Sequence, residues 1–139
     1  MRTLGIILCM ALGTMGCEKN NIDTAELAHN PFDADYSGPA LFEVEGATTS
    51  TWVDNDGIPH RQLLVRVRTR TTYFTHAASY HVECAPPTGG TVVLDPGPTN
   101  VFDLPPLNDV VTGQTYEWQL NVKSGLGTGG GNTVQATAQ

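Results

Sequence analysis

The chain has 139 residues with 7 Lys and Arg against 14 Asp and Glu, and its formal net charge is −7. That length accommodates one domain of ordinary size, and the acidic balance argues against nucleic-acid binding, which depends on Lys and Arg that neutralise phosphates. Charged residues make up 15% of the chain, below the roughly 25% usual in soluble domains. Thr and Val, with 15 Gly and 9 Pro, take their place and favour strands and turns over helices.

Residues 1–16 have the pattern of a cleaved export signal. Arg2 precedes the apolar stretch Leu4–Leu12, which falls well short of the roughly 20 residues that span a bilayer. Gly16 directly before Cys17 resembles the lipobox of bacterial lipoproteins, with Thr14 in place of the usual Leu. The resemblance implies cleavage before Cys17, a diacylglycerol on its thiol and a further acyl chain on its amine.

Two or three acyl chains would attach the protein stably to a membrane. Glu18 follows Cys17 in place of the Asp that commonly retains lipoproteins in the inner membrane. We therefore expect a lipid-anchored protein of the bacterial cell envelope, with the outer membrane favoured. The alternative is an ordinary secretory signal with cleavage elsewhere.

Residues 17–37 are polar without a sustained period and predict a flexible tether behind the lipidated cysteine. Residues 38–139 have about the size of an immunoglobulin-like domain, roughly 100 residues. The chain therefore divides into a signal peptide (1–16), a tether (17–37) and one domain (38–139).

Strand patterns separated by turns recur along the domain, and no helix is convincing. The predicted strands lie near Phe42, after the turn at residues 54–57, near Tyr80, at residues 91–95 and 101–107, from Tyr116 and from Val134. Pro105 and Pro106 make the fifth an edge strand or one that ends early. About seven strands favour an all-β fold, an antiparallel immunoglobulin-like β-sandwich. Residues 125–132 (GLGTGGGN) are expected to form a glycine-rich hairpin loop.

The segment from Val101 to Ser124 resembles a corner of fibronectin type III and related domains. In that family a Leu near a Pro is followed by a loop and a strand that opens with Tyr; here these are Leu104 or Leu107, then residues 108–115, then Tyr116. The resemblance implies that the Tyr116 hydroxyl bonds back to the loop backbone. The long loop and the lack of a Trp on the second strand depart from the family pattern.

Two acidic stretches are weak candidates for calcium sites. Asp33, Asp35 and Ser37 fit the opening of a calcium loop, but its twelfth position is Val44, not Glu. Asp54 and Asp56 have a similar spacing. The simpler alternatives are an acidic turn at the domain entrance and a hairpin tip.

Four histidines and Cys84 raise the question of a metal site. Residues three apart on a strand lie on opposite faces, so His81 and Cys84 should not converge. Zinc through His76 and His81 stays a minor alternative, and copper is disfavoured because all three Met lie in the signal. We expect no cofactor besides the lipid on Cys17, and expect Cys84 to be a small buried hydrophobe.

The interface candidates are one basic stripe and three aromatic residues. Arg66, Arg68 and Arg70 share one strand face. They would meet an acidic partner or form cross-strand pairs with Glu43 and Glu45. Trp52, Tyr73 and Phe74 are candidates because aromatic residues anchor interfaces.

No nucleophile elbow, zinc-protease motif or phosphate loop occurs in the chain. We therefore expect a non-catalytic, membrane-anchored lipoprotein that presents a binding or scaffolding β-sandwich to a protein or glycan. The binding loops would be residues 86–91, 108–115 and 125–132. The alternative is an accessory subunit of a larger envelope complex for secretion, polysaccharide uptake or surface motility; a calcium-binding module or a small enzyme is disfavoured.

Overall fold

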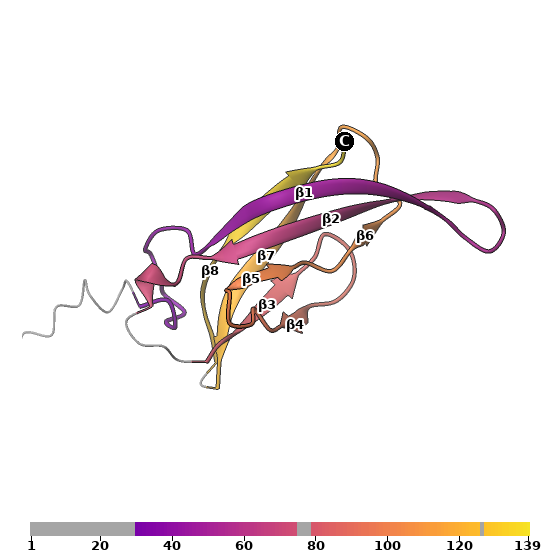
Figure 1. The fold of residues 1–139 in the computed structure, drawn as a ribbon. Helices are drawn as coiled ribbons and strands as arrows, with labels where there is room; N and C mark the ends of the chain where they lie inside the picture. Colours follow the sequence, from indigo (N-terminus) through magenta and orange to yellow (C-terminus); the bar gives the residue numbers. More distant parts are fainter. Residues whose placement is uncertain (1–29, 75–78, 126) are drawn as a thin grey trace, which may run out of the picture.

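The computed structural model describes residues 30–74, 79–125 and 127–139. They form two antiparallel sheets that pack as a β-sandwich (Figure 1), which confirms the predicted all-β fold class. The elements are β1 (Phe42–Val53), β2 (Pro59–Thr69), the 3-10 helix η1 (Thr71–Tyr73), β3 (His81–Ala85), β4 (Val92–Leu94), β5 (Val101–Asp103), β6 (Leu107–Asn108), β7 (Thr115–Ser124) and β8 (Gly127–Thr137).

One sheet has the order β1-β2-β5, with β6 also pairing with β2, and the other has the order β4-β3-β7-β8. The chain passes from one sheet to the other between β2 and β3, between β4 and β5, and between β6 and β7. The described residues give eight strands against the expected seven. The additional strand arises because Pro105 and Pro106 divide the predicted strand 101–107 into β5 and β6, since proline cannot donate to the ladder.

The core lies between the sheets and follows the alternation in the sequence. Trp118, Leu120 and Val122 of β7 are 0% exposed. From the facing sheet, β2 contributes buried Leu63, Val65 and Val67. Cys84 of β3 is buried among them while His81 is exposed, so the expected buried cysteine is confirmed.

The glycine run does not form the predicted hairpin loop, because β8 already begins at Gly127 and pairs with β7. A Cβ on Gly129 would meet the backbone of Pro31 and Phe32, and one on Gly130 would meet the ring of Tyr36. A Cβ on Gly131 would meet the Leu120 carbonyl. The run therefore allows close approach of neighbouring chain segments.

Part of the predicted tether belongs to the folded domain. Pro31 is fully buried, and its carbonyl accepts a hydrogen bond from the Gly130 N–H at 2.9 Å. Phe32 and Tyr36 pack against the core cluster. The boundary therefore lies at or before Asn30, because apolar residues at 31, 32 and 36 cover the glycines of β8. Residues 17–29, including Cys17, lie outside the described residues.

The corner before β7 has the contact that the fibronectin-like resemblance implies. The Val111 N–H donates a hydrogen bond to the Tyr116 hydroxyl at 2.9 Å. This bond ties the loop after β6 to the start of β7. The loop in turn lies beside β2, because the Val110 N–H donates to the Arg61 carbonyl.

β1 and β2 continue as a two-stranded hairpin beyond the rest of the sandwich. The turn of this hairpin and residues 30–40 lie at opposite ends of the domain (Figure 1). The hairpin is thus the part of the fold farthest from the N-terminal entry point.

Candidate functional site

The hairpin turn is stabilised by the Asp54 side chain. Its Oδ1 accepts hydrogen bonds from the backbone N–H of Asp56 at 3.0 Å and of Ile58 at 2.8 Å. Gly57 has a positive φ of 78°, which glycine adopts without strain. The predicted turn at residues 54–57 is therefore confirmed. The carboxylate of Asp54, a candidate calcium ligand in the sequence, accepts hydrogen bonds from backbone amides of the turn.

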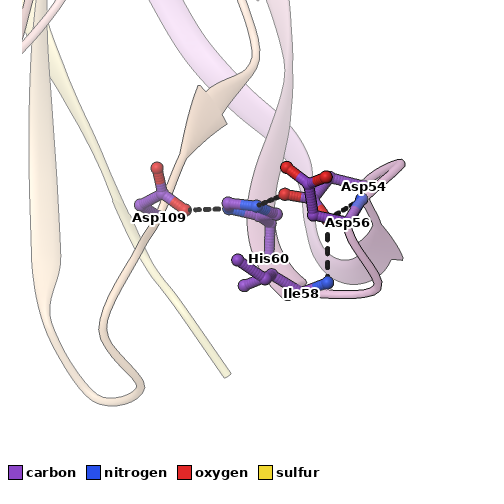
Figure 2. Close-up of polar contacts among 5 residues, drawn as sticks. All are labelled: Asp54, Asp56, Ile58, His60 and Asp109. Atoms are coloured by element: carbon purple, nitrogen blue, oxygen red, sulfur yellow. Dashed lines mark hydrogen bonds and ion pairs between the residues drawn. The ribbon is translucent and has the colours of Figure 1, made fainter.

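His60, near the start of β2, links this turn to the loop after β6. Its Nε2 lies 3.1 Å from Oδ2 of Asp54, and its Nδ1 lies 2.6 Å from Oδ1 of Asp109 (Figure 2). Asp109 adopts a left-handed conformation with φ 57°, a region that Asp tolerates better than most residues. The imidazole thus connects two elements that are far apart in the sequence.

The two carboxylates hold the imidazole towards its charged form. The hydrogen bond with Asp109, followed by the one with Asp54, raises the pKa of His60 above its ordinary 6.5. The Ile58 N–H, followed by His60, lowers the pKa of Asp54 below its ordinary 3.8. Both ring nitrogens of His60 contact carboxylates of this chain. The arrangement therefore fits a residue that positions the hairpin.

Trp52 completes the cluster from β1. It faces His60 across the hairpin, and the two rings stack with centroids 4.7 Å apart and planes 19° apart. The Trp52 side chain is nevertheless 43% exposed. We call Trp52, Asp54, His60 and Asp109 the tip cluster.

The arginine stripe is paired. Arg66 bonds Asp103 through Nε at 2.8 Å, Arg68 bonds Glu45, and Arg70 bonds Glu43. The predicted cross-strand pairing with Glu43 and Glu45 is therefore confirmed. A paired and exposed stripe contributes little to stability and offers weak attraction to an acidic partner.

A depression of about 700 Å³ lies over β1, β2 and the connection between β5 and β6. Gly46, Thr48 and Leu64 form part of its lining, and Pro105 and Pro106 form another part. Its one carboxylate, Asp103, is paired with Arg66. This pocket therefore lacks the pair of free carboxylates that an acid–base enzyme would use.

The remaining predicted site residues lie apart from the tip cluster. Asp33 accepts the Asp35 N–H in a turn beside Ser37. Within the described ranges, no group of three or more His, Cys, Asp or Glu side chains could hold a metal ion. Phe74 packs between Phe32 and Tyr80, with ring centroids at 5.3 and 4.9 Å, and its role at an interface stays a prediction. Tyr73 lies in η1, but its side chain is outside the described part of the structure. His76 lies outside the described residues.

Sequence reasoning identified Trp52 but missed His60 and Asp109. His60 had a detectable signal, because a hairpin around Asp54–Gly57 places it opposite Trp52. Asp109 had none, because its partner lies 49 residues away.

Comparisons of the chain with protein-family models, curated proteins and solved structures find no match. Among the residues that the structure describes, no helix has the length and hydropathy to cross a membrane.

Proposed function

We propose that the chain is a lipid-anchored lipoprotein of the bacterial envelope whose non-catalytic β-sandwich binds a protein partner through the β1–β2 hairpin. The anchor is supported by the apolar stretch Leu4–Leu12 and by Gly16 before Cys17. The outer membrane is favoured because Glu18 follows the cysteine.

The observation that carries this proposal is the position of the hairpin. The domain begins at one end of the sandwich and the hairpin extends from the other (Figure 1). An anchor before Asn30 therefore leaves the hairpin turned away from its own membrane. Its tip exposes Trp52, Val53 at 61% and Ile58 at 53%, and partly exposed aromatic and aliphatic side chains are typical of binding surfaces.

The second candidate is an accessory subunit of a larger envelope complex. Exposed Trp52 favours it, whereas packed Phe74 does not. The two candidates differ in whether the bound protein co-purifies stoichiometrically from solubilised membranes.

Site-specific photo-crosslinking in cells tests the binding role. A benzophenone side chain replaces Val53 at the tip, and in a matched control it replaces Val93, 52% exposed on β4 of the other sheet. We expect one discrete adduct from position 53 and none from position 93. Equal adducts from both positions, or none from position 53, would contradict the proposal.

A further inference from the structure

The outer edge of β1 is an unpaired sheet edge. β1 is the terminal strand of its sheet, and β2 is its one hydrogen-bonded strand neighbour in the described structure. An edge of this kind presents backbone N–H and C=O groups to which a further strand can pair.

The two halves of β1 differ in how they are protected. Near its start, the Asn132 side chain bonds the N–H groups of Leu41 and Phe42 and the Phe42 carbonyl. A register irregularity follows between Val44 and Gly46, where Glu45 adds a charge. Such bulges and charges discourage edge pairing. Residues 46–53 (GATTSTWV) contain neither a charge nor a proline. The Gln139 N–H donates a hydrogen bond to the Thr49 hydroxyl at 2.9 Å, and beyond this contact the stretch lacks those protections.

Trp52 lies on this stretch and is 43% exposed. His60, on the neighbouring strand, covers one face of the indole at near-parallel geometry. The opposite face is therefore turned towards the side of β1 that has no strand. Asp54 and Asp109 hold the imidazole of His60 and so fix the orientation of the ring on which Trp52 stacks.

The surroundings of this edge are acidic. Asp54 and Asp109 share the single imidazole of His60, and Asp56 has no ion pair among the described residues of the hairpin. Arg66, Arg68 and Arg70 of the same sheet are paired with carboxylates, whereas Arg61, opposite Thr51, donates to the Gln139 carbonyl. The whole chain carries −7. An electron-rich indole face within a negative field favours a cation, and arginine in particular, whose planar guanidinium stacks on aromatic rings.

We propose that the edge of β1 between Gly46 and Val53 pairs with an extended basic segment of a partner protein, with an arginine stacked on the face of Trp52 away from His60. The inference rests on the proposed binding role and names the chemistry of the partner. A second copy of this chain is a poorer occupant. Antiparallel pairing of two β1 edges sets the acidic turn of each copy near Glu43 and Glu45 of the other, and like charges across strands are destabilising.

The probe is an acetylated, amidated heptapeptide that alternates threonine and arginine. One control peptide carries glutamate in place of arginine, and another carries proline in place of threonine and so lacks most N–H donors. Binding to the full chain in detergent is measured by calorimetry and by tryptophan fluorescence. The chain has two Trp, and Trp118 is 0% exposed, so an exposed-site signal reports Trp52.

We expect the arginine peptide to bind, to shift the Trp52 emission and to weaken at high salt, and we expect neither control peptide to bind comparably. Trp52→Ala should weaken binding about fivefold, the scale of one cation–π contact. Thr51→Lys should abolish most of it, because a charge on the edge opposes pairing. Thr91→Lys, at an exposed threonine just before β4, is the matched control and should leave binding unchanged.

Equal binding of all three peptides, or no effect of Trp52→Ala in a variant with an unchanged melting temperature, overturns the inference. If the chain self-associates in a sedimentation experiment and Thr51→Lys removes this self-association, the edge belongs to a second copy, and the inference is overturned as well. A discrete adduct at position 53 without arginine-peptide binding would reject this partner chemistry while leaving the binding role intact. If the adduct at position 53 and the binding of the arginine peptide are both absent, the partner chemistry and the binding role are both rejected.

Discussion

The indole of Trp52 lies stacked on the imidazole of His60, with 4.7 Å between the ring centroids and 19° between the planes. Because Asp54 and Asp109 hold His60 from two different elements, this stack joins the hairpin to the loop after β6. The orientation of the exposed aromatic residue thus depends on an ionisable neighbour.

The charge on His60 should make the hairpin sensitive to pH. Its pKa is raised in the folded state by Asp109 and then by Asp54, so the stabilisation is fully present below the unfolded pKa and is lost as pH rises through the folded one. Asp109→Asn should lower the pKa of His60, as measured by NMR titration. The effect of Asp109→Asn on the melting temperature should be largest below about pH 6.5 and should fade above the pKa of His60 in the folded protein. A His60 pKa unchanged by Asp109→Asn would contradict this account.

The two tryptophans should differ in their effect on stability. Trp118 is 0% exposed in the core, and its removal leaves a large cavity, so Trp118→Ala should cost about 3–5 kcal/mol of unfolding free energy. Trp52→Ala, at an exposed hairpin position, should cost less than about 1 kcal/mol. Urea unfolding followed by circular dichroism measures both. Similar losses for the two variants would show that the hairpin is part of the cooperative core.

Gly130 should be required for docking of residues 30–37. A Cβ at this position meets the Tyr36 ring, so Gly130→Ala should cost about 1–3 kcal/mol and expose the Pro31–Tyr36 segment to limited proteolysis. Gly125→Ala, where a Cβ meets nothing within 4 Å, is the control and should leave the cleavage rate unchanged. Unchanged cleavage in Gly130→Ala would mean that this docking does not depend on the close approach.

The thiol of Cys84 should be inert in the folded protein. Burial raises its pKa to about 11, and the thiolate is the reactive form. Iodoacetamide at about pH 8 should therefore leave the Cys84 peptide unmodified until urea unfolds the domain, as read by peptide mass spectrometry. Rapid native alkylation would indicate that β3 opens readily.

The strands could be predicted from local patterns because the alternation of side chains along a strand is visible in residues that are adjacent in the sequence. The alternation from Tyr116 to Val122 places side chains on two faces of β7, and the charges of Arg68 and Arg70 match those of Glu43 and Glu45 across an adjacent hairpin. The resemblance at Tyr116 likewise implied its bond with the loop backbone.

Contacts between distant segments were not predictable in this way. Glycines 129–131 suggested a loop, because the close approach of Pro31, Tyr36 and Leu120 is visible only in the fold. Asp109 reaches His60 through the pairing of β6 with β2, a register that no local pattern specifies. The tip cluster therefore emerged from the structure, with Trp52 and Asp54 indicated beforehand as separate candidates.

The most direct test of the anchored binding domain is the intact mass of the protein purified from membranes, beside a Cys17→Ser variant. The account predicts a mass for residues 17–139 plus acyl chains, and a variant that is released or left unprocessed. An unacylated mass with cleavage at another position would contradict it, because the hairpin would then have no membrane from which to be presented.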